Sequence, residues 1–266
     1  PRSTPLYSSA ASDVYKRQMN DFIIIIPSRL SSTRLKEKAL LDLYGKTLIE
    51  RVYLRATQSN AEKVFIATDS KKIEDHVKTF TSNVVLTSHE HESGTDRVHE
   101  CASKLGISDD KVIVNVQGDE PFINPEDINL LAGCFENPTT KIATIVKKID
   151  TIETLENSNN PKVVLNAKKE ALYFSRAPIP HLKGLKKLDW LNHHTFYKHV
   201  GIYGFRTAIL KEISILPHGI LEQKEKLEQL RWLENGYRIQ TAETNSESIA
   251  VDCQEDLIRI DKKFFS

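Results

Sequence analysis

Short apolar runs alternate with stretches of helical periodicity in the first half of the chain. The runs predict strands at residues 22–26, 64–67, 84–86 and 112–116. Apolar side chains three or four positions apart predict helices between these strands, near residues 48–56, 73–80 and 96–105. Runs without polar positions are typical of strands covered on both faces of a sheet. The β-α-β-α order therefore predicts an α/β fold with a mostly parallel, doubly wound sheet and right-handed crossovers.

Two helix starts carry capping signals. Thr47 and Glu50 match a capping box, in which each side chain binds the backbone N–H of the other residue. Asn124 followed by Pro125 offers an N-cap and then a proline at the first helical position, where its missing N–H costs nothing. Helices are therefore expected to begin at residues 48 and 125.

The rhythm changes after Lys141. We expect a hairpin from strands at residues 163–165 and 171–174, followed by the irregular segment PIPHLKGLKKLDWLNHH. The later pattern predicts a strand in HVGIYGFR, a helix at 221–233, a strand at 238–242 and a last helix at 255–264. We interpret the change as the start of a substrate-binding half of the same domain.

Composition narrows the function classes. The chain has 266 residues, of which 39% are hydrophobic and 27% charged, as in folded globular proteins and unlike disordered chains. Lys and Arg number 37, and Asp and Glu number 36. The resulting net charge of +1 gives no indication of general nucleic-acid binding. No apolar run approaches the ~18 residues that a membrane helix needs.

The cysteines and the first residues are not expected to carry function. Cys101, Cys134 and Cys253 are too few and too far apart for a disulfide framework or a zinc motif, so we expect reduced thiols in a cytoplasmic protein. Residues 1–18 lack the apolar segment of a signal peptide and precede Met19, where the strand pattern begins. We expect a non-native or disordered leader, followed by a single domain at residues 19–266.

Two polar segments follow predicted strands, at the edge of the sheet where α/β proteins bind ligands. SRLSSTRLKEK follows the first strand and combines Arg29, Lys38 and several hydroxyls, a set that suits a polyphosphate. The chain has no G-x-G-x-x-G and no G-x-x-x-x-G-K-[ST], so neither a dinucleotide fold nor a P-loop is indicated. Taken alone, this segment is equally consistent with a solvated basic loop.

The second segment is QGDEP, at residues 117–121. Asp119 at a strand end suits Mg²⁺, which binds one or two carboxylates and completes its shell with water and phosphate oxygens. The alternative is a turn with solvent-exposed acids. The metal site is favoured because a phosphate-type loop follows a neighbouring strand.

Eight sequence blocks appear in order: IIPSRLSSTRL, ESGTDR, VNVQGDEP, KVVL, ALYFSRAPIP, HVGIYGFR, LEQLR and VDCQEDL. Together they resemble the 3-deoxy-manno-octulosonate (Kdo) cytidylyltransferases, also called CMP-Kdo synthetases. The resemblance implies transfer of CMP from CTP to Kdo, with release of pyrophosphate, for lipopolysaccharide synthesis. It also implies a nucleotide-diphospho-sugar transferase fold, a homodimer, a nucleotide-binding part at about residues 19–140 and a smaller, mixed sugar-binding and dimerisation part at about 141–266.

The resemblance further implies roles for individual residues. The triphosphate is expected to bind Arg29 and Lys38, and the cytidine to bind Ser93, Gly94, Thr95 and Arg97. Catalysis is expected to depend on Lys38 and on Mg²⁺ held by Asp119 and Asp252. The Kdo pocket is expected to be lined by Gln117, Arg176, His199, Tyr203, Glu228 and Gln229.

CMP transfer is consistent with these residue types. The anomeric hydroxyl of the sugar attacks the α-phosphorus of CTP, and negative charge accumulates on the phosphate oxygens. Two carboxylates can hold Mg²⁺ against the α-phosphate, where the metal can also lower the pKa of the attacking hydroxyl. Kdo is a carboxylic acid, for which the guanidinium of Arg176 is a suitable bidentate partner.

Other interpretations stay open. Structural roles are a helix cap for Asp252, an ion pair for Arg176, strand-core positions for His199 and Tyr203, and an exposed helix face for Glu228 and Gln229. His193 and His194 suggest a metal, but adjacent histidines do not share a helix face, so zinc is disfavoured. Rival functions are a cytidylyltransferase for 8-amino-Kdo or a sialic acid, and a non-catalytic nucleotide-binding protein.

Two blocks depart from the family pattern. The usual L-P-G-K-P-L is L-K-E-K-A-L at residues 35–40, which keeps Lys38 but places Glu37 beside the expected triphosphate. The usual V-D-T-P-E-D is V-D-C-Q-E-D at residues 251–256, which keeps Asp252 but loses the usual cap and first-turn proline. We expect these changes to affect loop geometry and affinity more than the reaction.

Overall fold

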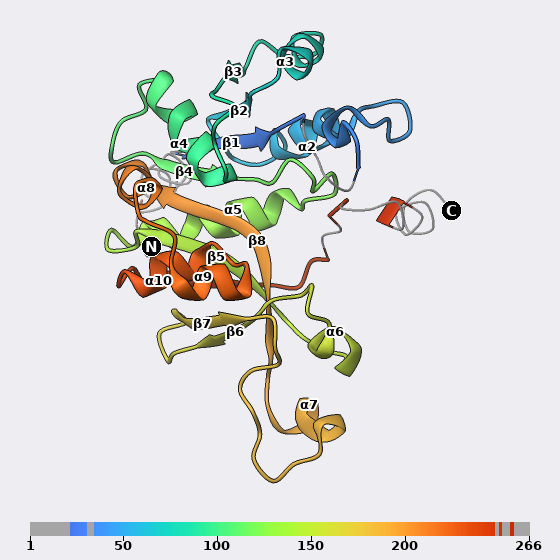
Figure 1. The fold of residues 1–266 in the computed structure, drawn as a ribbon, viewed down its shortest axis with the longest axis vertical. Coiled ribbons are helices and arrows are strands. Elements are labelled where there is room, and N and C mark those ends of the chain that lie inside the picture. The colour runs from blue at the N-terminus through green and yellow to red at the C-terminus, as the bar shows by residue number, and fades with distance from the viewer. Residues whose placement is uncertain (1–21, 31–34, 248–249, 252–255, 258–266) are drawn as a thin grey trace, which may run out of the picture.

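The computed structural model describes residues 22–30, 35–247, 250–251 and 256–257, which form an α/β structure around one sheet (Figure 1). The strand order is β3-β2-β1-β4-β8-β5-β9, and β6 and β7 form a hairpin beside β8. The strands are β1 Phe22–Ser28, β2 Lys63–Thr68, β3 Val84–Leu86, β4 Val112–Asn115, β5 Ile142–Lys148, β6 Lys162–Leu165, β7 Ala171–Ser175, β8 Tyr197–Arg206 and β9 Ile239–Thr244. Along the main path only β8 is antiparallel to its neighbours, so the predicted mostly parallel sheet is confirmed.

Helices cover both faces of this sheet. The α-helices are α2 Leu48–Ala56, α3 Lys71–Val77, α4 Gly94–Lys104, α5 Pro125–Gly133, α6 Ile152–Glu156, α7 Trp190–His193, α8 Thr207–Ser214, α9 Ile220–Glu225 and α10 Gln229–Glu234. Short 3-10 turns are η1 Lys38–Leu40, η2 Cys134–Glu136 and η3 Lys187–Asp189. Helices α2, α3 and α5 pack on one face, and α4, α8 and α10 on the other.

The apolar strands follow from this layering. In β1, Ile24 and Ile26 belong to the core on the α2 face, whereas Ile23 and Ile25 belong to the core on the α4 face. Successive side chains of a strand point to opposite faces, so a strand between two helical layers needs apolar residues at every position.

Both predicted helix starts are confirmed. Thr47 caps α2 and accepts a hydrogen bond from the Glu50 N–H at 3.4 Å. Asn124 caps α5, and Pro125 is its first residue. The side chain of Glu50 pairs with Lys46 in place of the Thr47 N–H, so the reciprocal half of the expected capping box is wrong.

The second half differs from the sequence prediction at several elements. The single helix expected at 221–233 is wrong, because Lys226 adopts a left-handed conformation (φ 53°) between α9 and α10. The pattern also missed β5, α6, α7 and α8. The last predicted helix lies largely outside the described residues, which include only 256–257 of it.

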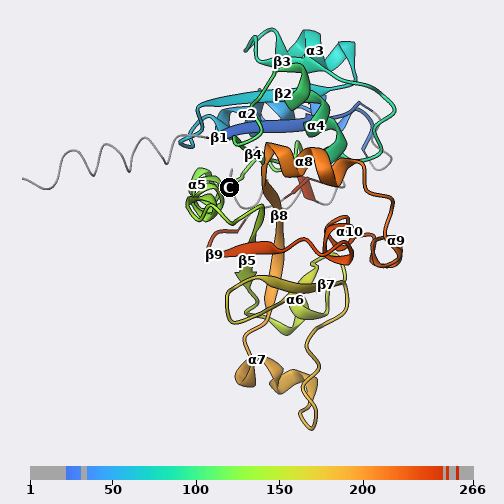
Figure 2. The ribbon, with the colours of Figure 1, turned by 90° about the vertical axis from the view of Figure 1, so that its left-hand side faces the viewer.

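Strand β8 connects the two parts of the molecule. It pairs with β4 near its end, with β5 along most of its length, and with β6 at its start. Figures 1 and 2 show it running from the helical layers to a projecting segment that carries α7. One sheet therefore continues across residue 141. In the part of the chain that the structure describes, no helix combines the length and apolar character needed to cross a membrane.

Candidate active site

A cavity of about 250 Å³ opens where β1 and β4 end. Its walls come from the segment after β1, from η1, from the start of α4 and from the turn after β4. The predicted site residues that line it are Arg29, Lys38, Ser93, Gly94, Arg97, Gln117 and Asp119. The structure thus brings together the two polar segments that the sequence placed at neighbouring strand ends.

The turn after β4 packs closely against β1. A Cβ atom at Gly118 would lie 2.7 Å from the carbonyl oxygen of Pro27, closer than side-chain carbons normally come. At Gly94 a Cβ atom would lie 3.3 Å from Cγ of the same proline. Glycine at position 118 therefore allows the QGDEP turn to rest on β1, which fixes the adjacent Asp119 at the edge of the sheet.

Asp119 is the central carboxylate of this cavity. Its Oδ2 accepts a hydrogen bond from Lys38 Nζ at 2.7 Å, and the Asp119 side chain is 28% exposed. The N–H of Val251 donates to the carbonyl oxygen of Asp119 at 2.8 Å, so the segment that leads into Asp252 runs beside Asp119. Asp252 itself lies outside the described residues.

The donor chemistry at Asp119 fits Mg²⁺. The carboxylate offers hard oxygen ligands to a cavity that also contains cationic side chains suited to phosphate. Within the described ranges, no three His, Cys, Asp or Glu side chains are grouped so that they could hold a metal ion. A site with one or two carboxylates, completed by water and phosphate oxygens, therefore matches this donor set better than an all-protein cage.

Glu37 does not line the cavity. It adopts the left-handed conformation (φ 53°, ψ 35°) at the position where the related loop pattern has glycine. Its carboxylate accepts a hydrogen bond from Lys72 Nζ at 2.6 Å, and this contact lowers the pKa of Glu37. In the altered loop, Glu37 therefore pairs with Lys72 outside the cavity, and Lys38 still contacts Asp119.

The start of α4 links the two halves of the site. Ser93 is the N-cap of α4, and its Oγ accepts a hydrogen bond from the Asp96 N–H at 3.1 Å. Thr95, which is 3% exposed, donates from Oγ1 to Glu228 Oε2 at 2.8 Å. This bond connects the nucleotide side of the cavity to the start of α10.

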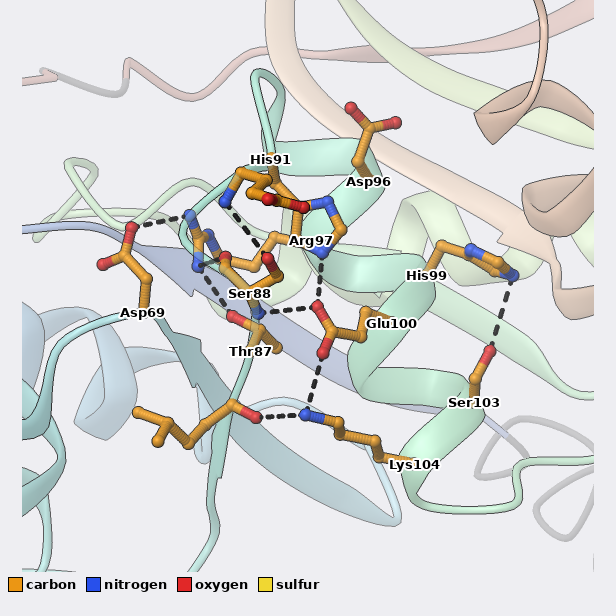
Figure 3. A network of polar contacts seen from close by, with 12 residues as sticks. Asp69, Thr87, Ser88, His91, Asp96, Arg97, His99, Glu100, Ser103 and Lys104 are labelled. Atoms are coloured by element: carbon orange, nitrogen blue, oxygen red, sulfur yellow. Dashed lines mark hydrogen bonds and ion pairs between the residues drawn. The ribbon is translucent and has the colours of Figure 1, made fainter.

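Arg97 lies in the cavity wall, where most of its guanidinium is already engaged (Figure 3). Nη2 contacts Asp69 Oδ2 at 2.9 Å, and Nη1 donates to Thr87 Oγ1 at 2.6 Å and to Ser88 O at 3.2 Å. Arg97 therefore ties the segment after β3 to the segment after β2. Its contact with cytidine stays a prediction.

His91 is a cavity residue that the sequence reasoning missed. Its Nε2 contacts Glu100, which also accepts hydrogen bonds from Lys104 and from the Ser88 N–H (Figure 3). Burial opposes ionisation of Glu100, but these hydrogen bonds outweigh it and lower the pKa of Glu100 to about 2. The available signal was the position of His91, two residues before the Ser93 cap.

The expected sugar residues of β8 lie among aromatic rings. His199 Nε2 is 2.9 Å from Thr144 Oγ1, and its ring lies 5.2 Å from Phe174 and 5.1 Å from Tyr203. Burial lowers the pKa of His199 to about 3, which keeps the ring neutral. Tyr203 is 7% exposed, and its hydroxyl has no hydrogen-bond partner among the described residues. A tyrosine with only a core role normally finds such a partner.

Glu228 and Gln229 do not lie on an exposed helix face. Gln229 is 4% exposed, and its Nε2 has no hydrogen-bond partner among the described residues. Glu228 accepts from Thr95 through Oε2, whereas its buried Oε1 has no hydrogen-bond partner there and lies 3.9 Å from Arg231 Nη2. Burial raises the pKa of Glu228. These residues therefore present unused polar atoms to the interior beside α4.

Arg176 binds backbone carbonyls at the break between α9 and α10. Nε donates to Glu225 O at 2.6 Å, Nη2 to Lys226 O at 3.2 Å and Nη1 to Ser158 O at 2.9 Å. Its backbone N–H donates to Glu225 Oε2 at 2.9 Å. The structural role of Arg176 is thus to bind backbone carbonyls, and not to form the ion pair considered as an alternative to sugar binding. Each Nη still has a second N–H.

Comparisons with known proteins place these features in a family. The cytidylyltransferase family profile matches residues 23–242. The 3-deoxy-manno-octulosonate cytidylyltransferase of Bacteroides thetaiotaomicron is 51% identical, over 89% of this chain and 95% of that protein. The enzyme of the same name from Francisella tularensis subsp. tularensis is 43% identical, over 92% of this chain and 99% of its own length.

A solved structure agrees with these sequence matches. The structure of CMP:2-keto-3-deoxy-manno-octonic acid synthetase complexed with CTP matches with a TM-score of 0.83 and 37% identity, over 91% of this chain and 98% of that chain. A cytidylyltransferase from Leptospira borgpetersenii matches with a TM-score of 0.57 at 15% identity, which supports the fold alone. Fold, ordered sequence blocks and near-complete coverage of the relatives agree: this chain belongs to the 3-deoxy-manno-octulosonate cytidylyltransferase family.

Proposed function

We propose that this chain transfers CMP from CTP to the anomeric hydroxyl of Kdo, giving CMP-Kdo and pyrophosphate for lipopolysaccharide synthesis. The observation that carries the proposal is the cavity beside Asp119, which Arg29, Lys38 and the start of α4 also line. Relatives named for this activity align over most of the chain, and a similar structure is complexed with CTP.

The cavity residues suit the triphosphate of CTP. Phosphoryl transfer depends mainly on positioning and on neutralising charge at the phosphate oxygens. Arg29 and Lys38 supply the positive charge, and Lys38 also holds the Asp119 carboxylate at 2.7 Å. The attacking hydroxyl would reach the α-phosphate from the α10 side, which the Thr95–Glu228 hydrogen bond joins to the start of α4.

Mg²⁺ is part of the proposal. Asp119 and Asp252 would hold the ion, because Val251 brings the segment that leads into Asp252 alongside Asp119. When bound, Mg²⁺ supplies positive charge at the α-phosphate and lowers the pKa of the sugar hydroxyl.

We also propose a cytoplasmic homodimer. The segment that carries α7 projects from the body and exposes apolar side chains, with Leu188 76% exposed and Leu185 39% exposed. A second copy of the chain would cover such a surface. Few and scattered cysteines suit a reducing compartment.

The experiment is pyrophosphate release from CTP and Mg²⁺ with Kdo, 8-amino-Kdo and a sialic acid compared in parallel. We expect release with Kdo and little with the other two acids. Release only with another acid would keep the reaction and change the substrate. A folded protein that binds CTP but releases no pyrophosphate with any of them would contradict the proposal.

A further inference from the structure

Buried polar atoms without hydrogen-bond partners gather on one side of the sheet. Within the described residues they belong to Asp96, Asn115, Tyr203, Glu228, Gln229 and Trp232. Such atoms are rare in folded proteins, because each one loses its water without a replacement. A group of them beside a reaction site therefore indicates a place that a polar ligand completes.

These residues are neighbours in the fold. Asn115 of β4 is directly opposite Tyr203 of β8, and the ring of Tyr203 lies 5.0 Å from Trp232 of α10. Glu228 precedes Gln229, and Asp96 lies close enough to it to add to the effect of burial, which raises the pKa of Glu228. Glu228 in turn adds to the effect of burial that raises the pKa of Tyr203. Gln229 and Tyr203 are 4% and 7% exposed, so their unused groups are enclosed.

Asp96 is the carboxylate of this group to which no role has been assigned so far. It sits in the first turn of α4, and its Oδ1 is buried without a partner. In Figure 3 its carboxylate points away from the network of Asp69, Arg97 and Glu100, and no contact is drawn to it. It does not line the cavity beside Asp119. Asp96 therefore faces the α10 side, beyond the nucleotide cavity.

We propose that Asp96, together with Glu228, forms the hydroxyl-binding end of the sugar subsite and sets the direction in which the acidic sugar lies. The inference rests on the proposed function. The two carboxylates accept hydrogen bonds from sugar hydroxyls, and the Nε2 of Gln229 donates to a sugar oxygen. The same negative charges repel the carboxylate of the sugar.

The direction follows from charge. The cationic side chains Arg29 and Lys38 line the cavity at Asp119, and the acidic pair lies outside that cavity. Arg231 also lies near the pair, but it donates two hydrogen bonds to Glu222, so the carboxylates there outnumber the cation. An anionic sugar is therefore favoured with its carboxylate and anomeric carbon toward the cations. Its hydroxyl-bearing tail then lies toward Asp96 and Glu228. This orientation presents the reacting hydroxyl to the α-phosphate.

The test is Asp96→Asn, which keeps the size of the side chain and removes its charge. Loss of a hydrogen bond to a charged group is expected to raise the KM for Kdo about tenfold or more. The KM for CTP should stay within about twofold, because Asp96 does not line the nucleotide cavity. Glu228→Gln is expected to show the same pattern and serves if Asp96→Asn fails to fold.

The matched control is Glu126→Gln. Glu126 is an exposed acid in the first turn of α5, so it shares the helix-terminal charge of Asp96 but lies away from the site. We expect this control to leave both KM values unchanged. A shortened Kdo analogue without the two terminal hydroxyl-bearing carbons adds a second measurement. Wild type should prefer Kdo strongly over this analogue, and Asp96→Asn should lose most of the preference.

An unchanged KM for Kdo in folded Asp96→Asn and Glu228→Gln, or an equal rise for Kdo and the analogue, would overturn the inference while leaving CMP transfer in place. If wild type prefers another acidic sugar, the same comparison is made with that sugar and its shortened analogue. A wild-type protein without turnover on any of these sugars would overturn the proposed function, and this inference with it.

Discussion

At the scale of single residues, the site depends on side chains whose positions other residues hold. Asp119 is fixed by the close packing of Gly118 on Pro27 and by the contact with Lys38. His199 is held against Thr144, where burial keeps its ring uncharged. A neutral imidazole can orient neighbouring groups without adding charge beside an anionic substrate.

His199 also predicts a pH dependence of stability. Its folded pKa is about 3, below the ordinary value of 6.5. Between these values the unfolded chain binds a proton that the folded chain does not, so this contribution to stability is full above pH 6.5 and is lost as the pH falls toward 3. His199→Gln removes the titrating group and keeps a partner for Thr144. Urea unfolding at pH 4, 5 and 7 should show a steeper loss for wild type than for the variant, and parallel losses would contradict the assignment.

At the scale of elements, the break between α9 and α10 determines which side chains of α10 point to the expected sugar site. The left-handed residue Lys226 ends α9 and lets α10 begin with Glu228 and Gln229 turned inward. The carbonyls freed at the break are taken by Arg176. Arg176 thus helps to position Glu228 and Gln229 by binding the backbone carbonyls just before them.

Arg176→Ala is expected to lower the free energy of unfolding by about 2–3 kcal/mol, since several charge-assisted hydrogen bonds are lost. It is also expected to raise the KM for Kdo, because Glu228 and Gln229 lose their support. Arg206→Ala is the matched control. Arg206 donates to two carbonyls, Asp110 O and Phe135 O, at the other end of the sheet. Equal stability losses with an unchanged KM for Kdo in both variants would leave Arg176 without a positioning role.

The same elements show what sequence can and cannot predict. Apolar runs such as residues 22–26 and caps such as Thr47 act locally, so their elements were predicted correctly. Lys226 is an ordinary helix former, and the side chain that binds its carbonyl oxygen at the break, Arg176, is fifty residues away in the chain. The partners of the partly buried charges in the site could not be predicted for the same reason, since they come from distant parts of the chain. The sequence identified Arg97 but not the contacts with Asp69 and Thr87 that engage it.

At the scale of the whole molecule, one sheet places the nucleotide and sugar sides next to each other. β4 carries Asn115 and leads to Asp119, while β8 brings Tyr203 directly opposite Asn115. The Thr95–Glu228 hydrogen bond then joins α4, on the nucleotide side, to the start of α10, on the sugar side. Family blocks predicted which residues belong to each side. The sequence could not show that Asp96 and Asn115 each bury an oxygen without a hydrogen-bond partner, because this depends on the packing of segments far apart in the chain.

The most direct measurement is ³¹P NMR of the reaction of CTP with Kdo and Mg²⁺, for wild type, Asp119→Asn and the surface control Asp75→Asn. Asp75 is a 58% exposed acid of α3, away from the cavity. We expect wild type and the control to convert the α-phosphorus into a new phosphodiester while the other two phosphates leave as pyrophosphate. Asp119→Asn should lose turnover about a hundredfold or more while still binding CTP. Turnover by Asp119→Asn close to that of wild type, or release of orthophosphate in place of pyrophosphate, would contradict CMP transfer at this carboxylate.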